Sequence, residues 1–92
     1  HEDDLYEFII PKKLNKKDFE IIQQMHEKFK YWRTSMEVTI MEDEIQALKE
    51  KFAETKLAFF IPMFEKLEEN TKKFNVNAIE NILDDLIKKT KK

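Results

Sequence analysis

The sequence predicts an all-α protein, a three-helix bundle with helices at about 16–36, 40–73 and 77–90. Apolar residues recur at steps of three and four along most of the chain, which is the period of one helix face. The chain has no glycine, a residue that β-hairpin turns and phosphate-binding loops usually require. Apolar residues make up 41% and charged residues 39%, a balance typical of a thin core with solvated outer faces.

Residues 1–14 are predicted to form an N-terminal arm or a short helix that packs against the bundle. Four apolar side chains stand at partly helical spacing before Pro11, namely Leu5, Phe8, Ile9 and Ile10. The chain's 92 residues are enough for one domain only. Its acidic start is unlike a signal peptide, so we expect residues 1–92 to be a single helical domain cut from a longer protein.

The first helix is predicted to begin after Asn15. Asn15 followed three residues later by Asp18 is typical of an N-cap with a first-turn acid. An apolar seam then follows one helix face to the end of the element, comprising Phe19, Ile22, Met25, Phe29, Trp32 and Met36.

The second helix is predicted to run from about 40 to 73 with a bend near Pro62. Thr39 and Glu42 match a capping box that would start it. Because neither glycine nor proline forces a turn near residue 38, one continuous helix over 16–56 remains an alternative. Pro62 would either bend the helix or stand in the first turn of a new one. The apolar stripe consists of Met41, Ile45, Leu48, Phe52, Met63, Phe64, Leu67 and Phe74.

The third helix, 77–90, has the most regular pattern. Asn77 with Glu80 is a cap signature, and acidic residues precede basic ones along the element, which complements the helix dipole. Its apolar face follows the i, i+3, i+4, i+7, i+8 spacing through Ile79, Ile82, Leu83, Leu86 and Ile87.

The residue inventory argues against catalysis. The chain has two histidines and no cysteine, so the usual metal-ligand sets are missing. The acidic run 42–44 lacks the glycine and the alternating ligands of a calcium loop. We therefore expect no enzymatic activity, no cofactor, no bound metal and no small-molecule substrate.

Residues 57–64 form an unbroken run of eight apolar residues, counting Pro62. A helix of this composition points apolar groups in every direction, so one face needs a cover outside a single core. Either residues 1–10 fold back over it, or it binds a helix or peptide of another protein, or it forms the seam of a coiled-coil dimer. Few cations flank the run and no apolar stretch reaches 18 residues, which disfavours membrane insertion. The predicted partner-binding residues are Phe59, Phe60, Ile61 and Phe64.

Nucleic-acid binding is a weaker alternative. Sixteen of the 17 cationic residues are lysines, and this usage, with abundant Ile, Asn and Phe, suggests an AT-rich genome. No segment is dense enough in charge, or in arginine, to indicate nucleic-acid binding by itself. The cations that would carry it are Lys12, Lys13, Lys16, Lys17, Lys28, Lys30 and Arg33.

The N-terminal half resembles the helical domain of the exported malaria-parasite proteins of the PHIST or RESA-like family. The resemblance rests on residues 4–9, residues 14–22 and the amphipathic run to Phe52. This chain is much shorter than that domain, and its single Trp, Trp32, stands early rather than in the later helices. The resemblance implies a protein-binding helical module that acts at the host-cell membrane skeleton or on parasite adhesins.

Overall fold

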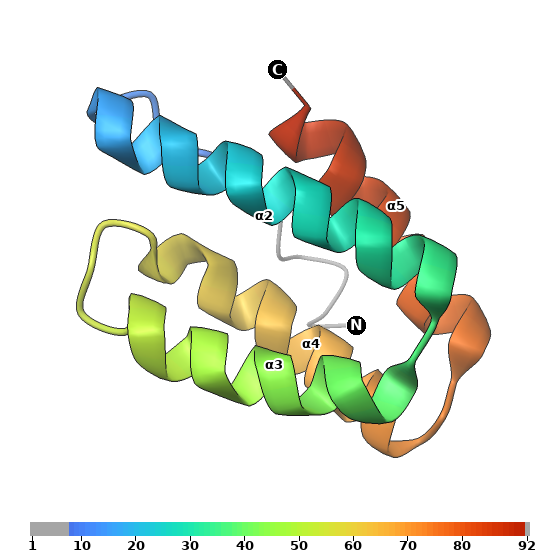
Figure 1. The fold of residues 1–92 in the computed structure, drawn as a ribbon. Helices are drawn as coiled ribbons and strands as arrows, with labels where there is room; N and C mark the ends of the chain where they lie inside the picture. Colours follow the sequence, from blue (N-terminus) through green and yellow to red (C-terminus); the bar gives the residue numbers. More distant parts are fainter. Residues whose placement is uncertain (1–7, 92) are drawn as a thin grey trace.

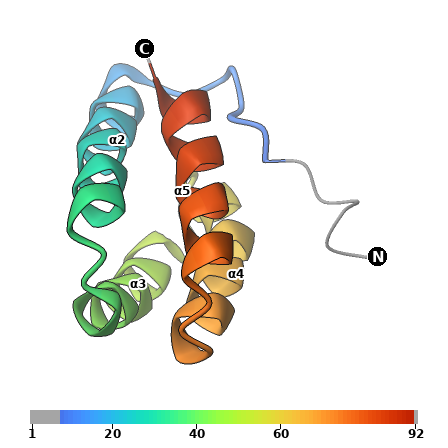
Figure 2. The same ribbon diagram turned by 90° about the vertical axis from the view of Figure 1, so that its right-hand side faces the viewer.

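The computed structural model describes residues 8–91, which contain four α-helices and no strand. The elements are α2 (Lys16–Ser35), α3 (Val38–Phe52), a short 3-10 helix η1 (Ala58–Phe60), α4 (Ile61–Lys72) and α5 (Val76–Thr90). Helix α2 runs antiparallel to α5, and α3 runs antiparallel to α4, so two antiparallel helix pairs face each other across one core (Figures 1 and 2). The all-α prediction is confirmed for the described residues.

The predicted single helix over 40–73 is wrong, and with it the count of three helices. The chain leaves α3 at Phe52, turns through residues 53–57 and returns as η1 and α4. Glu54 makes the turn with a φ of 61°, in the left-handed region. Pro62 stands in the first turn of α4, where its missing N–H group costs no helical hydrogen bond. Proline therefore helps to start a helix here and does not bend one.

The first two helices are separate, which rules out the continuous helix over 16–56. Met36 has a φ of 49° and ends α2, and its N–H donates to the Trp32 carbonyl at 2.9 Å. The next helix begins after Glu37, which makes no side-chain capping bond, so the capping role predicted for Thr39 is wrong. The break lets α3 turn back until Glu44 reaches Lys28 and Trp32 of α2.

One predicted cap is confirmed and another is displaced. Asn15 Oδ1 accepts from the Asp18 N–H at 2.8 Å, and Asp18 Oδ2 accepts from the Asn15 N–H at 3.3 Å, which is a capping box. At α5 the cap is Asn75, whose side chain accepts from the Ala78 N–H at 3.3 Å. The assignment of that role to Asn77 was therefore two residues late.

The core receives apolar side chains from all four helices, from η1 and from Phe8 before α2. The predicted helix faces are confirmed for most members, with Trp32 only 1% exposed. Two predicted stripe residues, Phe19 and Phe74, are instead 41% and 66% exposed. The buried apolar residues are Phe8, Ile22, Met25, Phe29, Trp32, Met41, Ile45, Phe52, Leu57, Phe60, Met63, Phe64, Leu67, Ile79, Ile82, Leu83 and Leu86.

A polar clamp joins α2 to α3. Lys28 Nζ lies 2.7 Å from Glu44 Oε2, and Trp32 Nε1 donates to Glu44 Oε1 at 2.8 Å. The hydrogen bond from Lys28, assisted by the one from Trp32, holds the pKa of the Glu44 carboxyl below its ordinary value, although partial burial acts in the opposite direction. The clamp therefore satisfies the indole N–H of a buried Trp and fixes the angle at which α3 leaves α2.

Candidate interaction surface

The structure places the predicted partner-binding residues around the core, not on one open face. Phe60 and Phe64 have no exposed surface, and their rings stack with centroids 5.6 Å apart. Met63 and Leu67 are buried on the same side of α4. Phe60, Met63 and Phe64 form the inner face of the apolar run, and Leu67 continues this face along α4. In the monomer these four side chains are not accessible to a partner.

Phe59 and Ile61, which belong to the same run, are half-buried. Phe8 packs against Phe59 and Phe60, with its ring centroid 5.7 Å from that of Phe59 and 5.3 Å from that of Phe60. Phe8 is itself only 2% exposed. Part of the predicted N-terminal arm, residues 8–14, thus supplies cover for the apolar run, whereas residues 1–7 lie outside the described residues.

Three of the seven cations proposed for nucleic-acid binding are held by carboxylates. Lys28 pairs with Glu44, and Lys30 lies 3.6 Å from Glu27. Arg33 bridges α2 to α5 by contacting Glu80 at 3.3 Å and Asp84 at 2.9 Å. The remaining four, Lys12, Lys13, Lys16 and Lys17, are exposed near the start of α2.

A groove opens where the first half of α2 meets the last turn of α5. It consists of two adjoining hollows of about 290 and 330 Å³, which share Phe19 and Gln23. Figure 2 shows the start of α2 and the end of α5 at the same end of the molecule, and hydrogen bonds from Gln23 and His26 to Thr90 place the end of α5 beside the middle of α2. We call it the α2–α5 groove, and its lining residues are Ile10, Lys16, Phe19, Glu20, Ile22, Gln23, Lys89, Thr90 and Lys91.

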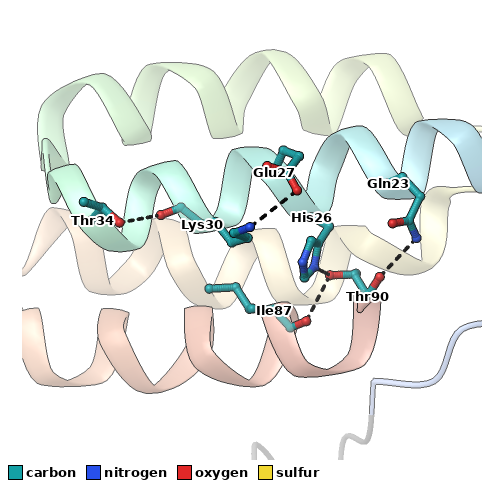
Figure 3. Close-up of polar contacts among 7 residues, drawn as sticks. All are labelled: Gln23, His26, Glu27, Lys30, Thr34, Ile87 and Thr90. Atoms are coloured by element: carbon teal, nitrogen blue, oxygen red, sulfur yellow. Dashed lines mark hydrogen bonds and ion pairs between the residues drawn. The ribbon is translucent and has the colours of Figure 1, made fainter. Parts of the chain in front are cut away.

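A hydrogen-bond network fixes the inner wall of this groove (Figure 3). Gln23 Nε2 donates to the Thr90 carbonyl at 3.2 Å, and His26 Nδ1 lies 2.9 Å from Thr90 Oγ1. The single hydroxyl proton of Thr90 is directed at the Leu86 carbonyl, 2.7 Å away, so the geometry assigns the proton of the second contact to His26 Nδ1. Thr90 is only 2% exposed. The groove therefore has a rigid wall although it lies at a helix end.

Phe19 is one of the two apolar side chains that the sequence pattern placed wrongly, and it is the one that lines the groove. Its spacing to Ile22 fits the inward seam of α2, yet the helix extends past the core at this end and leaves the ring 41% exposed. Lys89 and Lys91 were interpreted only as charges that complement the dipole of the last helix. No local signal in the sequence indicates that α5 ends beside Phe19, because that contact joins residues about 70 positions apart.

No cluster of three or more His, Asp or Glu side chains in residues 8–91 is arranged to hold a metal ion. None of the helices in this range is both long and apolar enough to cross a membrane. Protein-family models, curated proteins and solved structures provide no match to the chain. The resemblance to the PHIST or RESA-like family therefore stays a prediction.

Proposed function

We propose that this domain is a non-catalytic protein–protein interaction module that binds a segment of another protein in the α2–α5 groove. The observation that carries the proposal is the position of Phe19, a large aromatic residue that lines a concave surface while 41% of its area is exposed. Aromatic side chains in packed pockets commonly dominate interface energy. The groove also has a prearranged wall, which lowers the cost of ordering on binding.

The groove replaces the predicted contact site around Phe59, Phe60, Ile61 and Phe64 as the first surface to test. In the monomer, Phe60 and Phe64 have no surface that a partner could reach, and Phe8 packs against Phe59. A partner at that site would first have to displace Phe8 and open the core. A partner in the groove needs no such rearrangement, since Phe19 and Ile10 already face the hollow.

The test is selection of phage-displayed random 12-residue peptides on the full chain, followed by fluorescence anisotropy with the enriched peptides. Phe19→Ser should stay folded and weaken peptide binding about tenfold, because it removes a partly exposed apolar contact. The matched control Phe74→Ser, at a residue 66% exposed in the α4–α5 connection, should leave the affinity unchanged.

Two results would contradict this assignment. Either no peptide is enriched, or the enriched peptides bind Phe19→Ser as tightly as the parent chain. The alternative of self-association is tested by measuring the molecular mass of the peptide-free protein by sedimentation at several concentrations. If the chain dimerises and Phe19→Ser abolishes the dimer, the groove binds a second copy of this chain and not another protein.

A further inference from the structure

Lysines stand on both sides of the α2–α5 groove, with apolar side chains between them. Lys16 belongs to the first turn of α2, and Lys89 and Lys91 stand at the end of α5. The apolar residues that line the hollow with Lys89 and Lys91 are Ile10, Phe19 and Ile22, and Phe19 also lines the hollow with Lys16. Among the lining residues within 8–91, Glu20 is the single carboxylate, so three positive charges and one negative charge give this described lining a net charge of +2.

These lysines are less tightly engaged than the cations that join the helices. Lys28 and Lys49 lie 2.7 and 2.9 Å from carboxylates of a neighbouring helix. Lys89 only reaches Asp85 of its own helix, at 3.7 Å. Lys16 and Lys91 pair with no carboxylate within residues 8–91. The cations of the groove are thus available to a partner, whereas Lys28 and Lys49 are committed to the fold.

We propose that the partner is an acidic amphipathic segment of another protein, with one or two large apolar side chains flanked on both sides by Asp or Glu. This inference rests on the proposed function and specifies the chemistry of the same groove. The apolar group would cover Phe19 and Ile22, and its burial contributes most of the affinity. Carboxylates before and after it would face Lys16 on one side and Lys89 and Lys91 on the other, which contributes mainly orientation and association rate.

Glu20 narrows the choice of ligand. Glu20 lines the same hollow as Lys16, so a uniformly anionic ligand would place negative charge near a carboxylate. A segment in which apolar and acidic residues alternate avoids that contact and still meets both sides of the groove. The pattern of charges therefore favours a peptide over a polyphosphate backbone.

The test repeats the peptide selection on charge-reversed protein. The parent chain should enrich peptides rich in Asp and Glu around Leu, Ile or Phe. The triple variant Lys16→Glu, Lys89→Glu, Lys91→Glu should instead enrich basic peptides. The control Lys51→Glu, Lys56→Glu, Lys72→Glu has the same net charge at exposed lysines elsewhere, and it should keep the acidic preference.

Charge reversal could unfold the end of α5, so a second variant that only neutralises the lysines serves as a control. We expect the triple variant Lys16→Gln, Lys89→Gln, Lys91→Gln to keep the circular dichroism spectrum of the parent chain. Its affinity for the enriched acidic peptides should be about tenfold lower. Raising the salt concentration from 50 to 500 mM should weaken binding to the parent chain more than to this variant, because salt screens surface charges.

The outcomes separate this inference from the function on which it rests. If the peptides enriched on the parent chain depend on Phe19 for binding but are neutral or basic, the groove binds proteins, and the proposal of an acidic partner is wrong. If no peptide depends on Phe19, both proposals fail. Phosphatidylserine vesicles provide a further comparison. If the chain binds these vesicles through Phe19 and enriches no acidic peptides, the groove binds an anionic lipid, and the proposal of a peptide partner is wrong.

Discussion

Within residues 8–91, three residues other than glycine adopt left-handed backbone conformations, in a chain that has no glycine. Phe74 is the least expected of them, with a φ of 51° at the end of α4. Its N–H donates to the Thr71 carbonyl at 3.1 Å and the Asn75 N–H to the Asn70 carbonyl at 3.0 Å, which is the Schellman pattern that usually contains glycine. The side chain of Phe74 is 66% exposed, so little packing offsets the strained backbone.

Replacing Phe74 with glycine should therefore stabilise the protein. The left-handed conformation costs roughly 1–2 kcal/mol for a residue with a Cβ atom, and part of this gain is lost to the larger entropy of glycine in the unfolded chain. We expect Phe74→Gly to raise the free energy of unfolding by about 0.5–1 kcal/mol in urea denaturation. Phe74→Ala, which removes the ring but keeps the strain, should change it far less. A clear destabilisation by both variants would show that the ring is packed.

At the scale of the elements, ion pairs and hydrogen bonds set how the helices dock. The α2–α3 clamp centres on Glu44, whose side chain is 34% exposed and whose pKa is lowered mainly by the hydrogen bond from Lys28. Arg33 joins α2 to α5, and Lys49 joins α3 to α4 through Glu68 at 2.9 Å. Three pairs of neighbouring helices, α2–α3, α2–α5 and α3–α4, thus have a polar tie at the edge of the apolar core.

The clamp should make stability depend on pH in the acidic range. Because the folded pKa of Glu44 lies below its unfolded value of about 4.3, its contribution is present above that pH and is lost as the pH falls through the folded pKa. Glu44→Gln should lower the free energy of unfolding at pH 7, and the difference from the parent should disappear as the pH falls through the folded pKa of Glu44. Glu50→Gln, at an exposed position, should show no such change. If the difference in unfolding free energy between Glu44→Gln and the parent did not depend on pH, the negative charge of Glu44 would not contribute to the stability of the clamp.

At the scale of the whole molecule, one core connects all four helices. The radius of gyration is 12.6 Å, close to the ~12 Å expected for a compact domain of this length. Trp32 of α2 and Leu83 of α5 are both buried in this core, at 1% and 0% exposure. Because the α2–α5 and α3–α4 pairs share this core, we expect them to unfold together.

Leu83→Ala should cost roughly 2–4 kcal/mol of unfolding free energy, because it leaves a cavity in a fully buried position. The transitions followed by far-ultraviolet circular dichroism and by Trp32 fluorescence should shift together. Leu83→Ile keeps the side-chain volume and should cost less than about 1.5 kcal/mol. If the two probes gave separate transitions, the α2–α5 and α3–α4 helix pairs would be independent units.

The sequence by itself determined the helical class, the Asn15 cap and the inward faces of the helices. These properties depend on a period of 3.6 residues and on contacts within one turn, as the buried stripe of α5 illustrates. The reversal at residues 53–57 could not be predicted in this way. The left-handed turn there uses Glu54, a residue that carries no turn signal of its own.

The candidate site was decided almost entirely by the tertiary structure. Phe59 and Phe60 formed a plausible contact site until the fold placed Phe8 over them, a contact between residues about fifty positions apart. The α2–α5 groove likewise brings together Ile10, Phe19 and Lys91, which no local pattern connects. A helical period indicates which face of an element is apolar. It does not say where a helix extends beyond the core, because that depends on how the lengths and docking positions of all the helices fit together.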